Sequence, residues 1–288
     1  MPHFEKNTTS KYKLAAFDLD GTILDHGKLS TGTRRTLKAL HESGVHVVLA
    51  TGRHQKMILN VVEALPFVRY AITASGAQVV DLHTNDLISF VPLDHQAAVE
   101  LTRKITTTAK AINIFIKDFV LIRFGDMVKF RKEVSVKSVR REAKEFFQWA
   151  RFVFAPNIWV ANPKNVVFKI NAFFKTTDAC ERFLIDIKSI YAIEAVSTMG
   201  YDIEINSKGV HKGFALKQLC EHLQISTEET IIFGDSANDI EIMKCGGYAV
   251  AMGNASEDVK DIADRIAPSI KDDGAAQVLQ DLFELSVI

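Results

Sequence analysis

Cysteine is scarce in this chain, and neither sign of charge is in excess. The 288 residues include three cysteines, Cys180, Cys220 and Cys245, without a CxxC pair. A sparse and odd-numbered set indicates reduced thiols and excludes a disulfide framework. Lysine plus arginine and aspartate plus glutamate both total 35, so no overall charge favours nucleic acid or an anionic membrane. Local groups must therefore bind any charged ligand.

Long apolar segments are also missing. No run approaches the roughly 18–20 apolar residues that a membrane-spanning helix requires. Residues 1–13 are polar and lack the apolar stretch of a signal peptide. From these absences we expect a soluble, cytoplasmic protein. With 47% hydrophobic residues, the chain can form an ample core, in one large domain or two smaller ones.

Short apolar runs alternate with amphipathic segments in both terminal parts of the chain. The runs at 13–19 and 45–50 predict buried strands that end in polar loops, and the segments at 31–43 and 213–223 predict helices. Strands and helices in alternation are typical of a parallel α/β sheet with right-handed crossovers. We therefore expect a Rossmann-like core with a parallel sheet, built from the two ends of the chain.

The middle of the chain has a different pattern. A helix predicted at 93–109 is followed by two adjacent strands within 111–124, and a similar unit recurs within 177–205. Adjacent strands joined by short turns favour an antiparallel sheet, so we expect an inserted α+β domain that acts as a lid. The predicted division assigns residues 1–83 and 207–288 to the core and residues 84–206 to the inserted domain.

Acidic side chains follow the first and a later strand of the predicted core. Asp18 and Asp20 end the first strand, and Asp235 and Asp239 follow the run at 230–233. Because the carboxyl ends of parallel strands form one crevice, we expect these acids to converge. Four carboxylates in one crevice repel one another unless a cation is present. Hard oxygen ligands without nearby cysteine or histidine favour Mg²⁺.

Other residues of these loops suit a phosphate group. Thr22 and Thr51 offer hydroxyl groups, and Gly52 allows the backbone to approach a ligand closely. Lys212 can supply a fixed positive charge that stabilises phosphoryl oxygens. A carboxylate that attacks phosphorus gives an aspartyl-phosphate, and a second acid can then activate water.

In their order along the chain, these motifs resemble those of the haloacid dehalogenase superfamily. The matching elements are Asp18-x-Asp20-Gly21-Thr22, Thr51, Lys212 and Gly234-Asp235-x-x-Asn238-Asp239. The lid between the second and third motifs is similar to the type IIB cap of the Cof-like phosphatases. The segments at 249–255 and 272–274 are also similar to that group.

The resemblance implies roles for the four acids. Asp18 is implied to be the nucleophile and a Mg²⁺ ligand, and Asp235 a further metal ligand. Asp20 is implied to be the general acid/base, with its backbone carbonyl on the metal. Asp239 is implied to orient Lys212 or the metal's waters. Members that cleave carbon–halogen or carbon–phosphorus bonds typically lack an acid at the position of Asp20, so its presence favours phosphate ester hydrolysis.

The resemblance also implies how the phosphate is held. Thr51 and Lys212 are implied to hold the phosphoryl group, and Asn238 to help bind the phosphate. Together with Thr22 and Gly52, which are inferred from their chemistry, Thr51 and Asn238 form the predicted phosphate-binding set. One departure is visible, because relatives often carry Asn-Gly-Ala where this chain has residues 75–77, Ser-Gly-Ala. A ligand contact of the serine at position 75 is therefore left open.

Three other features have a structural and a functional interpretation. Arg53 is more often a surface or ion-pair residue than a ligand, although it can approach the substrate in this group. His211 is interpreted as a loop histidine rather than a catalytic one. The basic segment at 129–144 is interrupted by two glutamates. This composition favours a solvated face of the lid over a nucleic-acid site. A third interpretation, between these two, is a lid helix that steers an anionic substrate toward the site.

These inferences predict a Mg²⁺-dependent phosphatase that acts on a small phosphorylated metabolite, such as a sugar phosphate or a vitamin-derived phosphate, through phospho-Asp18. Neither a nucleic acid nor a membrane is an expected partner. Two alternatives stay open: phosphoryl transfer to another acceptor, as in a mutase, and a non-catalytic regulatory protein that binds a phosphometabolite. The intact Asp20 argues against the second. The lid has no diagnostic motif, and the oligomeric state is not predicted.

Overall fold

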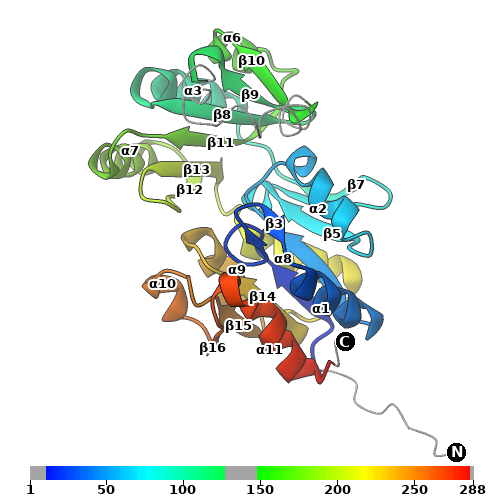
Figure 1. The fold of residues 1–288 in the computed structure, drawn as a ribbon. Helices are drawn as coiled ribbons and strands as arrows, with labels where there is room; N and C mark the ends of the chain where they lie inside the picture. The colour runs from blue at the N-terminus through cyan, green and yellow to red at the C-terminus, as the bar shows by residue number, and fades with distance from the viewer. Residues whose placement is uncertain (1–10, 127–147, 286–288) are drawn as a thin grey trace, which may run out of the picture.

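The computed structural model describes residues 11–126 and 148–285, and the statements below concern these residues. They form one domain on an eight-stranded sheet and a second domain on a six-stranded sheet, one above the other in Figure 1. The basic segment at 129–144 lies outside the described residues. No helix in the described part combines the length and the apolar character needed to cross a membrane.

The eight-stranded sheet brings the two ends of the chain together, in the order β16, β15, β14, β1, β4, β5, β6, β7. Neighbours from β16 to β5 are parallel, and β6 and β7 are antiparallel additions at one edge. The strands are β1 (Leu14–Phe17), β4 (His46–Ala50), β5 (Tyr70–Thr73), β6 (Gln78–Asp81), β7 (Asp86–Phe90), β14 (Thr230–Gly234), β15 (Tyr248–Ala251) and β16 (Arg265–Ile266). The short strands β2 (Leu24–Asp25) and β3 (Lys28–Leu29) pair separately.

Helices cover both faces of this sheet because its central strands are apolar on both sides. Ala15 and Phe17 of β1 belong to the cluster under α1 and α11, whereas Leu14 and Ala16 belong to the cluster under α8 and α9 (Figure 1). Successive side chains of a strand point to opposite faces, so a strand buried on both faces needs apolar residues at every position. The helices are α1 (Thr31–Glu42), α2 (Leu59–Ala64), α8 (Lys212–Leu223), α9 (Ile240–Cys245), α10 (Glu257–Lys260) and α11 (Gly274–Phe283).

The predicted boundary between the core and the inserted domain, after residue 83, differs from the point where the chain leaves the eight-stranded sheet. β7 lies beyond residue 84, yet it pairs with β6 and completes the eight-stranded sheet. Its side chains are exposed or half-buried, so its sequence does not show the continuous apolar pattern of the central strands. Strand pairing therefore extends the core to Phe90, and the inserted domain begins with α3 (His95–Thr108).

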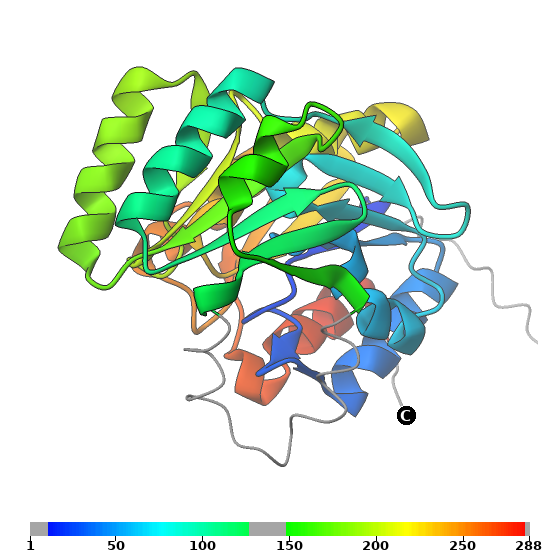
Figure 2. The same cartoon turned by 90° about the horizontal axis from the view of Figure 1, so that it is seen from above.

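The inserted domain, called the cap below, is a six-stranded sheet with helices on one face. Its order is β10, β9, β8, β11, β13, β12, and all pairs are antiparallel except β9 with β10. Figure 2 shows the cap helices on the side of this sheet that faces away from the core. The elements are β8 (Ala111–Ile116), β9 (Phe119–Arg123), β10 (Ala150–Val153), α6 (Pro156–Ala161), β11 (Val167–Phe173), α7 (Thr177–Ile190), β12 (Ile193–Val196) and β13 (Asp202–Ser207).

The opposite face of the cap sheet packs on the core. Phe115 of β8 and Phe168 of β11 form one buried cluster with Ala74 and Ala77, which follow β5. The cap therefore lies directly against the loops at the carboxyl ends of the parallel strands.

Candidate active site

The predicted nucleophile and the predicted cation are in direct contact. Asp18 follows β1 and is only 6% exposed. Its Oδ1 accepts a hydrogen bond of 2.6 Å from Nζ of Lys212, which lies 194 residues further along the chain. Lys212 is fully buried and also donates to Oδ1 of Asp239 at 2.7 Å. One ammonium group therefore bridges two buried carboxylates.

Local structure fixes the position of Lys212 at the start of α8. His211 caps this helix, because its Nδ1 accepts a hydrogen bond of 3.2 Å from the backbone N–H of Phe214. The loop after β5 packs against the same point. Gly76 has a φ of +102°, and a Cβ atom there would lie 2.2 Å from the carbonyl oxygen of His211. Glycine is therefore required at this close approach, and His211 has a structural role.

Three of the four predicted acids form a cluster. One carboxylate oxygen from each of Asp18, Asp235 and Asp239 lies within 4.8 Å of the others. Thr22 donates to Oδ1 of Asp235 at 3.2 Å. The single hydroxyl proton of Thr22 is therefore donated to a predicted metal ligand and not to a phosphate group. Gly21 makes this packing possible, since a Cβ atom at its φ of +89° would lie 2.3 Å from Oδ2 of Asp235.

Asp239 uses both of its carboxylate oxygens within the protein. Oδ1 accepts from Lys212, and Oδ2 accepts from the backbone N–H groups of Asp235 and Ser236, each at 3.1 Å. Of the two roles implied for Asp239, this geometry favours the orientation of Lys212. The same contacts hold the loop that carries Asp235.

The carboxylate of Asp20 lies apart from the cluster. Arg53 donates to it through Nε at 2.8 Å and through Nη2 at 2.5 Å. The Asp20 side chain is 56% exposed and that of Arg53 24% exposed. The predicted metal contact of Asp20 was its backbone carbonyl, so the carboxylate itself is available for acid–base chemistry. The sequence did not decide between a surface, an ion-pair and a ligand role for Arg53. In the structure Arg53 contacts the predicted general acid.

The loop after β4 carries the two other predicted phosphate-binding residues. Thr51 is 1% exposed, and its Oγ1 accepts from the backbone N–H of Arg53 at 3.2 Å. Because it accepts here, its hydroxyl proton can be donated to a ligand. The carbonyl oxygen of Gly52 accepts a hydrogen bond of 2.8 Å from Lys169 of the cap. This loop therefore contacts the cap as well as the core.

Asn238 and Ser75 also bind cap residues. Nδ2 of Asn238 donates to Oε2 of Glu204 at 3.2 Å, and Oγ of Ser75 donates to the same oxygen at 2.5 Å. Sequence reasoning missed both Lys169 and Glu204. The available signals were one lysine within the mainly apolar run Val167–Phe173 and one glutamate between two isoleucines in Asp202–Ser207.

One ammonium group, that of Lys212, does not neutralise the three carboxylates of the acid cluster. Burial raises the pKa of Asp18 well above its usual range, and Asp239 and Asp235 raise it further against the effect of Lys212. Burial, with the Asp239 carboxylate, raises the pKa of Asp235 to about 7. Burial lowers the pKa of Lys212, but Asp18 and Asp239 outweigh it and raise this pKa above its usual value. A divalent cation with a preference for oxygen ligands fits this donor set.

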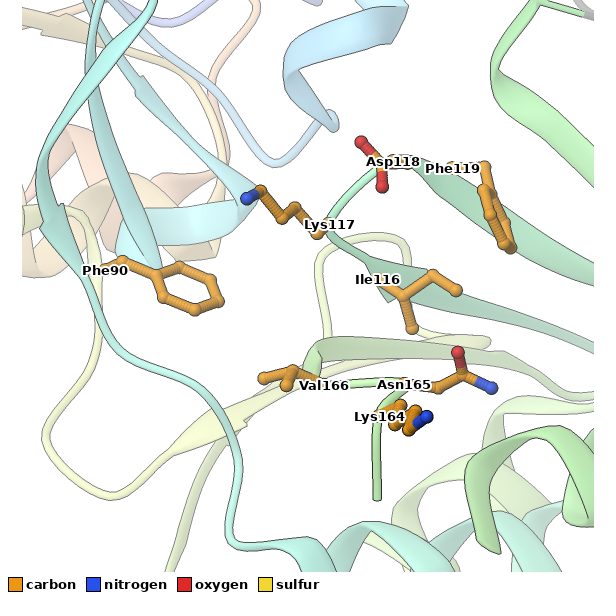
Figure 3. Close-up of a pocket in the computed structure, with 8 residues that line it drawn as sticks. All are labelled: Phe90, Ile116, Lys117, Asp118, Phe119, Lys164, Asn165 and Val166. Carbon is orange, nitrogen blue, oxygen red and sulfur yellow. The ribbon is translucent and has the colours of Figure 1, made fainter. Parts of the chain in front are cut away.

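A separate pocket of about 160 Å³ lies beside the contact between cap and core. Figure 3 shows Phe90 on one side and the β8–β9 turn, from Ile116 to Phe119, on another. Nearby, Nε2 of His54 donates to the carbonyl oxygen of Ile116 at 3.0 Å. The pocket lining contains one acid, Asp118, and none of the clustered carboxylates, so it is distinct from the candidate active site.

Curated relatives match nearly the whole chain. Phosphatase YwpJ of Bacillus subtilis is 26% identical over 285 residues, covering 94% of this chain and 100% of the relative. The 5-amino-6-(5-phospho-D-ribitylamino)uracil phosphatase YcsE of Bacillus subtilis is 28% identical, covering 93% and 94%. The HMP-PP phosphatase of Cronobacter sakazakii is 27% identical, covering 84% and 85%.

Solved structures share the fold. A haloacid dehalogenase-like hydrolase from B. subtilis superimposes with a TM-score of 0.81 at 24% identity, covering 93% of this chain and 99% of the other. A subclass IIB sugar phosphatase of the same superfamily gives 0.78 at 22% identity, covering 95% and 100%. These similarities confirm the predicted combination of an α/β core with a cap. The family model for haloacid dehalogenase-like hydrolases matches residues 15–279, and the chain belongs to this family.

Proposed function

We propose that this protein is a Mg²⁺-dependent phosphatase that hydrolyses a small phosphomonoester through a phosphorylated Asp18. The contact between Lys212 and Asp18 carries the proposal. The ammonium group opposes the effect of burial on the Asp18 pKa and adds positive charge beside the oxygen atoms that would attack phosphorus. Asp239 holds the ammonium group in this position.

In the proposed reaction, an Asp18 carboxylate oxygen attacks phosphorus while the bond from phosphorus to the ester oxygen breaks. Asp20 gives its proton to the departing oxygen, and the phosphoryl group stays on Asp18. Water then attacks phosphorus and passes a proton to Asp20, which restores both acids and releases inorganic phosphate. One Asp20 oxygen must leave Arg53 for the ester oxygen while the other keeps its hydrogen bond to the guanidinium group, and the 56% exposed side chain of Asp20 allows this movement.

Asp18 and Asp235 would hold the metal ion, together with the backbone carbonyl of Asp20. Bound Mg²⁺ supplies positive charge that offsets the repulsion between the carboxylates and the phosphoryl oxygens. Asp239 remains on Lys212 and the backbone of its own loop. Thr51 would donate its hydroxyl proton to a phosphoryl oxygen.

The names of two relatives support a small phosphorylated metabolite as the substrate: a 5-amino-6-(5-phospho-D-ribitylamino)uracil phosphatase and an HMP-PP phosphatase. A cytoplasmic location is part of the proposal. All three cysteines are free thiols, as expected for a reducing compartment.

The test is an Asp18→Asn variant on a panel of phosphate esters with Mg²⁺. We expect its turnover to fall by at least about a thousandfold, because an amide does not replace the nucleophilic carboxylate. Asp25→Asn is the matched control, since Asp25 lies on β2 and takes no part in the acid cluster. Wild-type turnover by Asp18→Asn would remove Asp18 as the nucleophile.

A further inference from the structure

Two charged residues lie buried in the middle of cap strands. Lys169 of β11 is 0% exposed and Glu204 of β13 is 8% exposed. Their side chains form an ion pair with 2.9 Å between Nζ and Oε1. A buried ion pair pays several kcal/mol of desolvation per ion and adds little to stability compared with apolar residues of the same size. Stability therefore does not explain the pair.

A strand irregularity directs Lys169 toward the core. The pairing of β11 with β8 shifts register between Val167 and Lys169. Val167 and Ile170 both pack in the cluster under the cap helices, whereas Phe168 packs in the cluster that faces the core. In a regular strand Val167 and Ile170 would lie on opposite faces. The shift thus places two consecutive residues, Phe168 and Lys169, on the core side, as β-bulges near active sites do.

Glu204 reaches the same side by simple alternation. The two isoleucines that flank it in β13 pack under the cap helices, so Glu204 points to the opposite face. Glu204 pairs with Asn171 of β11 in the antiparallel register. Although burial raises the pKa of Glu204, Lys169 and Ser75 outweigh this effect and lower it to about 2. The group is therefore a carboxylate at neutral pH.

The pair contacts the three core loops that follow β4, β5 and β14. Lys169 donates to the carbonyl oxygen of Gly52 at 2.8 Å and to Oγ of Ser75 at 2.9 Å. Glu204 accepts from Ser75 at 2.5 Å and from Asn238 at 3.2 Å. Gly52 lies so close that a Cβ atom there would be 2.8 Å from Oε1 of Glu204. Two of these residues, Gly52 and Asn238, belong to the predicted phosphate-binding set.

The loop after β5 needs such support. Ala74 and Ser75 have positive φ angles of 50° and 56°, a region that costs roughly 1 kcal/mol or more for residues other than glycine. The backbone N–H of Ser75 donates to the carbonyl oxygen of Thr51 at 3.0 Å. Because the Ser75 side chain is bound by both members of the pair, the strained loop is held against the phosphate-binding loop after β4.

We propose that Lys169 and Glu204 are positioning residues of the cap that hold Gly52, Ser75 and Asn238 in the arrangement that binds phosphate. The proposal rests on the phosphatase function proposed above. It means that the phosphate site is assembled by both domains, because the core loops take their final positions from the cap. The pair acts through these core residues and needs no contact with the substrate.

The double variant Lys169→Met/Glu204→Leu tests this role, because it removes both charges together and leaves no unpaired ion. We expect its free energy of unfolding to equal or exceed that of the wild type. We expect the inhibition constant of inorganic phosphate to rise roughly ten- to a hundredfold, as for other residues that orient binding groups. The KM for an ester should rise in parallel, with a smaller change in kcat.

The matched control is Lys104→Met/Asp186→Leu, which removes another ion pair of the cap, with 2.5 Å between Nζ and Oδ2. These residues join α3 to α7 on the helical face of the cap, so the inhibition constant should stay at the wild-type value. A wild-type inhibition constant of inorganic phosphate in Lys169→Met/Glu204→Leu would overturn the proposal. If that variant does not fold, Ser75→Ala takes its place, since it removes the hydroxyl group that binds both members of the pair and leaves the two ions paired. An unchanged inhibition constant there has the same meaning.

The wild-type measurement separates this proposal from the proposed function. Absence of phosphatase activity in the wild type on the whole panel contradicts the function itself. Activity in the wild type with unchanged phosphate inhibition in the double variant contradicts the positioning role alone.

Discussion

Arg53 binds both carboxylate oxygens of Asp20, through Nε at 2.8 Å and through Nη2 at 2.5 Å. The predicted general acid is therefore oriented by a residue of the neighbouring loop, two positions after Thr51. Both side chains are partly exposed, and an exposed ion pair contributes at most about 1 kcal/mol to stability. The contact is better explained by the orientation of Asp20 than by the stability of the fold.

Replacement of Arg53 by methionine should therefore affect the reaction more than the fold. We expect Arg53→Met to reduce kcat/KM for a phosphate ester by about tenfold, with less than about 1 kcal/mol change in the free energy of unfolding. Steady-state kinetics and urea denaturation measure the two effects. Arg53→Lys keeps one charge and should retain intermediate activity. An undiminished kcat/KM in Arg53→Met would show that Asp20 needs no partner.

Lys212 should matter for stability as well as for chemistry. In Lys212→Met, Asp18 and Asp239 remain buried without their cation, so we expect a loss of about 3–5 kcal/mol in the free energy of unfolding. Millimolar Mg²⁺ should restore part of this loss, because it binds the acid cluster of the folded state. Urea denaturation with Mg²⁺ and with a chelator measures both.

Lys244→Met is the comparison for this variant. Lys244 pairs with Glu241, and the two side chains are 53% and 48% exposed, so its loss should change stability by less than about 1 kcal/mol. Equal unfolding curves for Lys212→Met and Lys244→Met would mean that the buried carboxylates do not need the ammonium group.

His54 should make the fold sensitive to acid. Its Nδ1 accepts from the backbone N–H of Lys56, so Nε2 carries the proton that is donated to Ile116. Burial, helped by Lys56 and opposed by the Ile116 carbonyl and Asp118, lowers its pKa from 6.5 to about 4. Between these pH values the unfolded chain binds the proton more strongly. The stability contribution is therefore complete above pH 6.5 and is lost as the pH falls toward 4.

The variant His54→Gln keeps an N–H donor and cannot be protonated. The difference between the folded and unfolded pKa values of His54 corresponds to at most about 3 kcal/mol in the free energy of unfolding. We expect the fall in unfolding free energy between pH 6.5 and 4 to be smaller in His54→Gln by up to this amount. His83 is exposed, and His83→Gln should follow the wild-type curve. Parallel curves for His54→Gln and the wild type would contradict the prediction.

Asn171 should contribute to the choice of leaving group. It lies between Asn113 of β8 and Glu204 of β13 in the strand pairing, on the cap face that turns toward the core. Its Oδ1 is buried and has no hydrogen-bond partner among the described residues. We expect Asn171→Leu to lower kcat/KM for a hexose phosphate by about tenfold. The value for p-nitrophenyl phosphate should stay unchanged, because that leaving group has no further hydroxyl group.

Thr102 provides the control for this prediction. Its Oγ1 is the other buried side-chain oxygen without a partner in the described part of the chain, but it lies on α3, on the helical face of the cap. Thr102→Val should therefore leave both kcat/KM values unchanged and should not reduce stability. Equal losses on both substrates in Asn171→Leu would point to a general structural effect instead.

Local patterns were enough to predict the core and the residues of its acid cluster. Apolar runs such as Leu14–Phe17 predict strands buried on both faces, and the alternation with helices predicts a parallel sheet. Parallel strands end at one edge, so the convergence of Asp18, Asp235 and Asp239 follows from the order of the motifs. Local periodicity also predicted the helix at Thr177–Ile190 and the strands beside it.

The directions of individual side chains were decided by tertiary structure. Asp20 binds Arg53 rather than the acid cluster, and Asn238 binds Glu204 of the cap. The contacts of the cap pair join residues 117 and 129 positions apart, Lys169 with Gly52 and Glu204 with Ser75. No local pattern encodes such contacts, because they depend on a register shift in β11 and on how the cap packs on the core. The sequence thus determined which groups meet at the sheet edge, and the packing of two domains decided which of them touch.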